Sequence, residues 1–523
     1  MQYKRKIIAS LLIGSGIISA PLVASANDST ELEELRALVQ ELDQKVRVLA
    51  RQNEVNAEDA AAAKATTPIV NASQNGFGLK SADGQHEIKL RGAIQTDARF
   101  FPGGDGVASG NTNAGKVTAA DTALLKQFRP ILQGTLWGKY DFLLTPDFGN
   151  SKVVVQDAYV DAKFNPWFQV KAGKQKTPFG IERLQGDADG KFTERALPND
   201  LVPNRDIGVQ FHGQVADSRL EYALGYFNGV IDGGSSDSYT NVDTDNNRDK
   251  DFVARVFATP FKNDPGFLQG LGFGFGATYG DQRGSAVTST TAATASQSNL
   301  PGFKSGLGQQ TFFTYRTTAV ATTVAAGGLA GNGSTYADGQ RYRWSPQFNY
   351  YNGPFGLLGE YVRVSQDVSR QTATGVTRSD KLNNDSWQIV ASWLLTGEDA
   401  SYTNPNPKQP FDLDKGTGWG AWELVARYSE LSVDDKAFNP FGAATNPTLK
   451  AQAQARSYAD PRSAARKASA WATGINWYLN RNLKIALDYE RTSFDGGWTD
   501  TAGTAYLDRP TENAVTTRLQ IGF

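Results

Sequence analysis

The sequence contains no cysteine, and its single methionine is the first residue. It therefore has no disulfide framework to hold a fold together. After Val23 no apolar stretch approaches the ~20 residues that a membrane-spanning helix requires. Basic and acidic residues nearly balance, at 53 and 54, so the overall basicity typical of nucleic-acid binding is also missing.

Aromatic residues and glycine are abundant, with 28 Phe, 19 Tyr, 10 Trp and 53 Gly in 523 residues. The mean hydropathy is nevertheless low, at -0.43. Many aromatic residues and glycines without spanning helices are typical of a chain built from many strands and turns.

The N-terminus has the order of a secretory signal peptide. Lys4, Arg5 and Lys6 precede a mostly apolar stretch from Ile7 to Val23, and Ala24-Ser25-Ala26 is a small-residue cleavage motif. Glycines and Pro21 interrupt the apolar stretch, which argues against a permanent membrane anchor. We therefore expect residues 1–26 to be removed and the mature chain to start at Asn27.

The next segment, residues 27–56, is predicted to be a short coiled coil. Apolar residues recur at the a positions (Leu32, Val39, Val46) and the d positions (Leu35, Leu42, Leu49) of three heptads. Valine at a with leucine at d favours a parallel dimer, although three heptads do not decide between dimer and trimer. A single amphipathic helix packed on another surface is the alternative. Residues 57–84 are expected to form a linker.

From residue 85 to the end, segments of about ten residues are apolar at alternate positions and are separated by turn residues. In the last segment Val515, Leu519, Ile521 and Phe523 share one parity, and Arg518 takes the other. A soluble β-sandwich also shows one-sided alternation, but its inner face is dry and does not need charges. In segment after segment, charged residues occupy the positions that alternate with the apolar ones, which predicts a transmembrane β-barrel instead. Such a barrel must close so that every backbone group is paired.

Sixteen segments of this kind can be counted, which predicts an all-β, 16-stranded antiparallel barrel with both ends on the periplasmic side. They are expected near 86–101, 124–137, 139–147, 153–164, 168–175, 206–216, 219–228, 250–260, 271–280, 341–351, 355–365, 385–396, 420–431, 468–479, 482–492 and 512–523. Short and long connections alternate between them, and 397–419 is unusually long for a periplasmic turn.

Five blocks of the chain together resemble the phosphate- and polyphosphate-selective porins, from about residue 85 to Phe523. They are Gly173–Gly180, Leu201–Gly208, Trp393–Glu398, Trp422–Tyr428 and Asn476–Asn480. The resemblance implies a trimeric, 16-stranded barrel whose third outer loop, 176–205 by our count, folds inward. It also implies phosphate binding by lumen arginines and constriction lysines. Phe523 resembles the terminal signal read by the barrel assembly machinery.

Parity and loop position select a set of basic residues as pore-lining and anion-binding candidates. Rings of Arg and Lys select anions, and Arg binds phosphate oxygens through a bidentate fork. Acidic residues share the same parity, so structural ion pairs between neighbouring strands are the alternative. The candidates are Lys89, Arg91, Arg99, Arg129, Lys139, Lys171, Lys174, Lys176, Arg183, Arg195, Arg219, Arg255, Arg341, Arg343, Arg427 and Arg518.

An enzymatic or cofactor-dependent function is not indicated. The chain has two histidines, His86 and His212, both within expected strands, and no His, Cys and carboxylate cluster has metal-ligand spacing. The glycines at 272, 274 and 276 alternate with phenylalanine inside a strand, with no helix following, so they are not a dinucleotide fingerprint. We expect no cofactor, no metal and no nucleic-acid partner.

The sequence therefore predicts a porin in the outer membrane of a Gram-negative cell. It would open a water-filled channel for passive uptake of small solutes, prefer anions such as phosphate or polyphosphate, contact outer-membrane lipids and assemble as a homotrimer. The alternative is a structural envelope protein with a plugged barrel and a coiled-coil tether.

Overall fold

The computed structural model describes residues 28–73, 76–102, 119–236, 249–286, 298–318, 333–372, 377–439, 457–499 and 506–523. The signal peptide expected at residues 1–26 lies outside these ranges. The chain divides into two compact units, Met1–Thr67 and Pro68–Phe523. No helix among the described residues is both long and apolar enough to cross a membrane.

The first unit contains one long helix, α1 (Asp28–Thr66). Its heptad residues are exposed, with Leu35, Val39 and Leu42 each more than 60% accessible. Ion pairs one turn apart, Glu41–Lys45 and Asp43–Arg47, support its polar face. The helix is as expected, while its coiled-coil partner stays a prediction.

The linker expected at 57–84 is instead structured over most of its length. Helix α1 continues to Thr66 because residues 57–66 are mainly alanine with Glu58 and Lys64, which are strong helix formers, and it ends just before Pro68. Strands β1 (Ile69–Ser73) and β2 (Gly76–Lys80) then pair antiparallel, and β2 pairs with the first strand of the barrel. These two strands are too short for the alternation of side chains to reveal them in the sequence.

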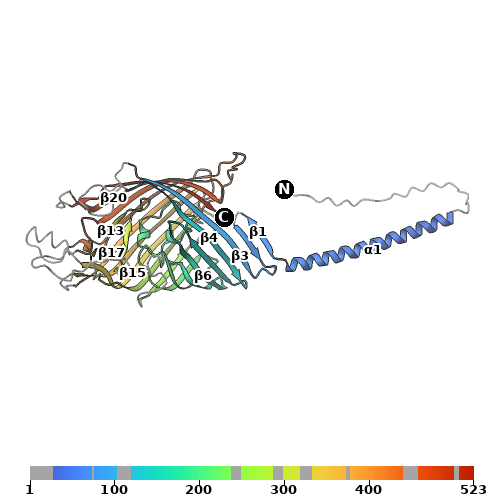
Figure 1. Cartoon of the computed structure of the whole chain (residues 1–523), viewed down its shortest axis with the longest axis horizontal. Coiled ribbons are helices and arrows are strands. Elements are labelled where there is room, and N and C mark those ends of the chain that lie inside the picture. Colours follow the sequence, from blue (N-terminus) through green and yellow to red (C-terminus); the bar gives the residue numbers. More distant parts are fainter. Residues whose placement is uncertain are drawn as a thin grey trace, which may run out of the picture. The chain divides into compact units, whose positions relative to one another are not determined.

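The second unit is a closed antiparallel barrel of sixteen strands, as predicted (Figure 1). All sixteen expected segments are strands, with bounds that shift by up to eight residues: β3 (Glu87–Phe100), β4 (Thr122–Leu136), β5 (Tyr140–Asp147), β6 (Val154–Asn165), β7 (Phe168–Lys176), β8 (Arg205–Val215), β9 (Leu220–Phe227), β10 (Asp251–Ala258), β11 (Leu271–Arg283), β15 (Gly333–Asn352), β16 (Phe355–Thr372), β17 (Thr377–Leu394), β18 (Ala421–Ser432), β19 (Ala465–Tyr478), β20 (Leu483–Thr499) and β22 (Glu512–Gly522).

The barrel closes where β22 pairs with β3, in a register that places Ile521 opposite Ile94. Phe523 extends this seam, because its backbone N–H donates to Gly92 O and its O accepts from Gly92 N. A Cβ atom at position 92 would lie 2.5 Å from Cζ of Phe523, so only glycine allows the terminal ring to lie across the seam.

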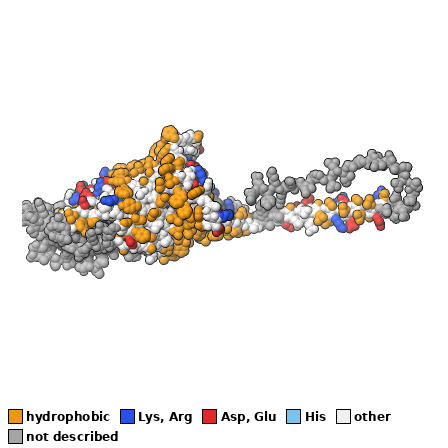
Figure 2. Space-filling model, turned by 90° about the horizontal axis from the view of Figure 1, so that it is seen from above, with side chains coloured by type: hydrophobic (Ala, Val, Ile, Leu, Met, Phe, Trp, Pro, Cys, Tyr) orange, Lys and Arg blue, Asp and Glu red, His pale blue; other side chains and the backbone are white. Residues whose placement is uncertain are grey.

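The outer face of the barrel carries the apolar residues of the alternating pattern. Leu90, Phe128, Leu224, Trp471 and Ile521 are all more than 40% accessible, and hydrophobic side chains cover much of the face shown in Figure 2. Because lipid and not water covers such a surface, the exposed residues need no partner within the chain.

Short elements and apolar side chains fill part of the interior. Val362 and Leu382 on the wall pack in one buried cluster with Phe303, Phe312 and Phe313 from the segment between β11 and β15. Besides β1, β2 and the barrel strands, the second unit contains the short elements α2 (Ile181–Leu184), η1 (Leu197–Asp200), β12 (Gly302–Lys304), β13 (Thr311–Thr314), β14 (Thr317–Thr318), η2 (Asp435–Phe438) and β21 (Tyr506–Asp508), of which β21 is exposed. The barrel is therefore not an open tube along its whole length.

Candidate functional site

The connection between β7 and β8, residues 177–204, folds into the barrel and is called loop L3 here. Its backbone carbonyls accept hydrogen bonds from four wall strands: Asp187 O from Gln95 (3.3 Å), Ala188 O from Gln520 (3.0 Å), Gly190 O from Lys484 (2.8 Å) and Lys191 O from Asn476 (2.8 Å). Buried carbonyls need donors, and the wall supplies them. The inward-folded loop expected at 176–205 is confirmed.

Buried carboxylates fix the start of L3. Glu360 on β16 accepts the backbone N–H of Ile181 (3.1 Å). Glu182 accepts from Gln388 on β17 (2.8 Å) and from Asn199 further along the loop. Helix α2 is thereby tied to the wall on one side and to the end of L3 on the other.

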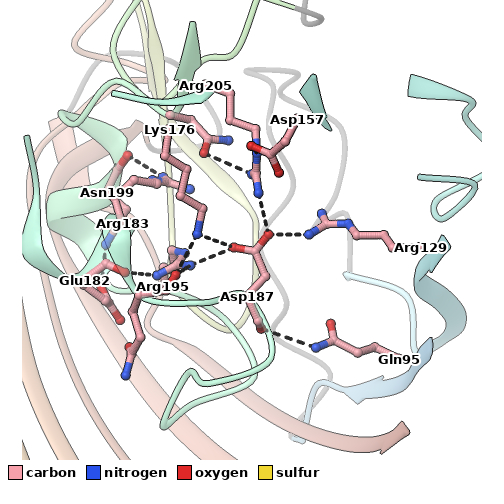
Figure 3. Close-up of polar contacts among 12 residues, drawn as sticks. Gln95, Arg129, Asp157, Lys176, Glu182, Arg183, Asp187, Arg195, Asn199 and Arg205 are labelled. Carbon is pink, nitrogen blue, oxygen red and sulfur yellow. Dashed lines mark hydrogen bonds and ion pairs between the residues drawn. The ribbon is translucent and has the colours of Figure 1, made fainter. Parts of the chain in front are cut away.

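The centre of the site is Asp187, around which four basic side chains converge (Figure 3). Its Oδ1 is 3.1 Å from Lys176 Nζ and 2.8 Å from Arg195 Nη2, and its Oδ2 is 2.9 Å from Arg205 Nη2 and also contacts Arg129 Nη1. We call Asp187 with Arg129, Lys176, Arg195 and Arg205 the Asp187 cluster. β4, β7, the start of β8 and L3 itself each contribute to it.

The cluster holds its carboxylate in the ionised form. Burial alone would raise the pKa of Asp187, but Lys176, Arg205, Arg129 and Arg195 lower it well below its usual value. Two of the cations have a second carboxylate, since Arg129 Nε donates to Asp147 (2.7 Å) and Arg205 Nε to Asp157 (3.0 Å).

Arg183 lies beside the cluster without a carboxylate of its own. Its Nη2 donates to Asn199 O (3.0 Å), and its Nε is buried without a hydrogen-bond partner among the described residues. Burial and the nearby Arg195 lower the pKa of Arg183 to about 10. A guanidinium in this position has unused capacity to bind an anion.

A cavity of about 430 Å³ separates L3 from the β4–β6 wall and from residues 301–309. Basic side chains outnumber acidic ones in its lining. The basic residues are Lys126, Arg129, Arg183, Arg195, Arg205, Lys304 and Arg518; the acidic residues are Asp187, Glu194, Asp200 and Asp232. The cavity therefore favours small anions electrostatically.

A second group of charges on the wall is balanced. Arg341 and Arg343 on β15 reach Asp232 and Asp251, with Arg343 Nη2 2.6 Å from Asp232 and Arg341 Nη2 2.8 Å from Asp251. All four side chains are at most 5% accessible. We call these four residues the Arg343 network.

Most of the other sequence candidates form ion pairs. The pairs are Arg99 with Glu194 (3.2 Å), Arg427 with Glu490 (2.8 Å), Arg518 with Asp97 (2.7 Å), Lys171 with Asp161 (3.6 Å) and Lys89 with Glu87 (2.8 Å). Arg91 and Arg255 donate to glutamine side chains, Gln133 (3.2 Å) and Gln347 (3.1 Å). The ion pairs that the sequence left as the alternative are therefore common, and an anion-binding role for these residues stays a prediction.

Two candidates lie in turns instead of the strand positions expected for them. Lys139 falls in the turn before β5, and Arg219 in the turn before β9, where it pairs with exposed Asp264 (3.4 Å). Both strands begin one residue later than expected. Lys174 follows Gly173, which has a positive φ of 125°, and lies opposite Ala158 and Ile207 in the sheet.

Lys126 lines the cavity although parity did not select it. The register between β3 and β4 shifts between Gln95 and Thr96, which pair with Gln127 and Leu125, so that Lys126 is the extra residue of a β-bulge. Its Nζ contacts Glu194 on L3. The sequence analysis also missed Asp187. An irregular loop has no periodic pattern from which the orientation of a side chain can be inferred.

The 397–419 connection, at the opposite end of the barrel from the loops that join β3 to β4 and β7 to β8, also reaches L3. Tyr402 donates its O–H to Ile181 O, and Asn404 donates its backbone N–H to Asp189 (3.0 Å) and its side-chain amide to Ala188 O (2.8 Å). L3 is thus held from both ends of the barrel.

Neither histidine suggests a reactive centre. His212 Nε2 lies 3.0 Å from Asp161 on the wall, and His86 packs against the ring of Trp137. Within the described ranges, no three His, Cys, Asp or Glu residues are grouped as a metal site would require.

Several known proteins are similar to this chain over most of its length. Porin O of Pseudomonas aeruginosa is 22% identical over 439 residues, which cover 82% of this chain and 87% of that protein. The outer membrane channel DcaP of Acinetobacter baumannii aligns with 12% identity and a TM-score of 0.46, over 86% of this chain and 99% of that one. An anion-selective porin from Comamonas acidovorans aligns with 12% identity and a TM-score of 0.42, over 84% and 100%.

The model of one protein family matches most of the chain. It is described as phosphate-selective porin O and P, and it matches residues 94–523, which span all sixteen barrel strands apart from the first residues of β3. The chain belongs to the phosphate-selective porin O and P family and is an outer-membrane porin.

Proposed function

We propose that this porin conducts small anions and holds them transiently at the Asp187 cluster and the adjoining Arg183, with phosphate or polyphosphate as the solute. The observation that carries the proposal is the predominantly basic lining of the 430 Å³ cavity beside L3. Bidentate arginines fit phosphate oxygens, and several spaced cations allow an anion both to enter and to leave. The family description and the name of the anion-selective relative point the same way.

Planar-bilayer recording of the purified protein tests this proposal. In a potassium chloride gradient the reversal potential should report anion preference, and added inorganic phosphate should reduce the chloride current by competing for the same cations. Cation preference would contradict the anion assignment. Anion preference without phosphate block would contradict only the phosphate assignment.

The inward loops and the apolar cluster of the interior favour a second candidate, a plugged barrel with a structural role in the envelope. The same recording separates the two functions. Discrete steps of ion current support the channel, whereas a correctly folded barrel that gives no steps at all supports the structural role.

We also propose a homotrimer with α1 in the periplasm, where the exposed seam at 32–49 would be covered by the same helix of other protomers. A homotrimer is what the family resemblance implies, and the heptads alone favour a dimer. The short-turn end of the barrel would then face the periplasm. Cross-linking of the purified protein with and without residues 28–66 tests the assembly: trimers that persist without the helix would assign the assembly contacts to the barrel.

A further inference from the structure

Among the carboxylates that the structure describes in the lumen, Asp187 differs in how its oxygens are used. Each of its two oxygens contacts two basic groups: Oδ1 lies near Lys176 and Arg195, and Oδ2 near Arg205 and Arg129. In the Arg343 network, by contrast, two arginines meet two aspartates. Asp187 therefore occupies the position that a bound oxyanion would take among these cations.

The carboxylate also borders open volume. Asp187 lines the 430 Å³ cavity, and its side chain is 16% accessible while Arg205 is 5% accessible. It lies in the turn Gly186–Gly190, whose backbone is held through Ala188 O and Gly190 O by wall residues Gln520 and Lys484. Rotation of the Asp187 side chain into the cavity would uncover the cations and leave this turn in place.

We propose that Asp187 is a tethered competitor for the anion site: its carboxylate occupies the cationic cluster and is displaced by the permeating oxyanion. This inference rests on the proposed function and adds the residue that sets the affinity of the site. A group tethered beside its binding site acts at a high effective concentration, so a free anion must bind in competition with it. The competition weakens the site and shortens the stay of each anion, as fast conduction requires.

The ionisation of Asp187 is consistent with this role. The surrounding cations keep the pKa of this carboxyl well below its usual value despite burial, which favours the charged form of the competitor. With a neutral residue in the same position, Lys176 and Arg195 would lose their carboxylate, while Arg129 and Arg205 would keep Asp147 and Asp157.

Neutralising Asp187 tests the idea against a matched control on the same turn. Asp189 is two residues away. Its Oδ1 accepts a hydrogen bond from the backbone N–H of Asn404 and not from a basic residue of the Asp187 cluster. In planar bilayers, Asp187→Asn should lower the inorganic phosphate concentration that half-blocks the chloride current by about tenfold or more. Asp189→Asn makes the same change in net charge and should shift the half-blocking concentration much less.

The absence of native cysteine provides a second readout. Asp187→Cys should block at low phosphate like Asp187→Asn, and reaction with a negatively charged sulfonatoethyl thiosulfonate should restore a tethered anion and wild-type sensitivity. A positively charged aminoethyl reagent should not restore it. Equal phosphate sensitivity in Asp187→Asn and Asp189→Asn, or weaker block in Asp187→Asn than in wild type, would overturn the proposal.

Repulsion among the uncovered cations could prevent the single variants from folding. The pair Arg129→Gln and Asp187→Asn/Arg129→Gln reduces this repulsion, and the double variant should bind phosphate more tightly than Arg129→Gln alone. An unchanged or weaker block in the double variant would overturn the proposal. Wild-type protein that is cation-selective would instead contradict the proposed function on which the inference rests.

Discussion

Two groups of arginines inside this barrel contain similar side chains but differ in their balance of charge and in their burial. The Arg343 network pairs two arginines with two aspartates and is almost fully buried. The Asp187 cluster gathers four basic groups around one central carboxylate, beside a cavity lined by further cations. Balance and burial indicate a structural role, whereas a surplus of one sign beside open volume indicates a site for a mobile ion.

The largest effect is expected from breaking the balanced group. Arg343→Gln leaves the buried carboxylates of Asp232 and Asp251 with one arginine between them, which should cost about 3–5 kcal/mol of stability. The measurement is the midpoint temperature of the heat-modified shift in gel migration. The control is Arg462→Gln, which removes a partly exposed partner of Asp460 and should cost about 1 kcal/mol or less. Equal midpoint temperatures for Arg343→Gln and Arg462→Gln would contradict a structural role for the Arg343 network.

In contrast to Arg343→Gln, Arg183→Gln should have a large effect on conduction and a small effect on stability. Arg183 has no carboxylate within ion-pair distance among the described residues, so its removal leaves no unpaired acid there. Losing one charged donor to an anion should weaken phosphate block by about tenfold. The half-blocking phosphate concentration and the midpoint temperature are measured together, and a variant with a lowered midpoint temperature but unchanged block would give Arg183 a structural role.

The charge of the cavity should also depend on pH through Asp200 on L3. Burial raises the pKa of Asp200 to about 7, against an ordinary value of 3.8, although the backbone N–H of Lys304 partly opposes this effect. The cavity therefore gains a negative charge between pH 6 and 8, and the anion-to-cation permeability ratio should fall by roughly twofold. Asp200→Asn should abolish that change in reversal potential.

The same shift has a consequence for stability. Between its ordinary pKa and about 7, Asp200 holds its proton more firmly in the folded protein than in the unfolded chain. The free energy of unfolding should therefore fall as pH rises through this range and stay low above it. If Asp200→Asn titrates like wild type, another group is responsible for the change.

The smallest effect is expected where L3 meets the connection from the opposite end. Tyr402→Phe removes the O–H that donates to Ile181 O and should cost about 1 kcal/mol, because a buried carbonyl loses its donor. L3 should then fluctuate more, which increases the noise of the open-channel current while selectivity stays unchanged. A change in selectivity would extend the anion site to this contact.

Much of the wall could be predicted because it is periodic. All sixteen strands follow from the alternation between lipid and lumen, and the interior facing of Arg129, Arg341, Arg343, Arg427 and Arg518 follows from parity. Lys126 departs from parity because one extra residue in β4 changes the face that its side chain occupies. The residues 57–66 were assigned to a linker because composition alone did not show that the helix continues until Pro68.

The centre of the site could not be predicted in the same way. Asp187 lies in a loop, 58 residues in sequence from Arg129 and 18 from Arg205, and only the path of L3 through the lumen brings these three together. Such contacts depend on the closure of the barrel, which no local pattern records. The sequence therefore named Arg129, Lys176, Arg183 and Arg195 as candidates, but not the carboxylate that they surround.

The seam between β22 and β3 bears on how this chain can be made. Gln95 hydrogen-bonds Gln520 across it (2.7 Å), a contact between residues 425 positions apart. Until the last strand is available, the sheet has two open edges, which can pair with any other extended chain. Contacts of such long range also form slowly. The nascent protein must therefore be kept from folding and from aggregating until its final residues have been synthesised, and loss of even the last strand would expose both edges permanently.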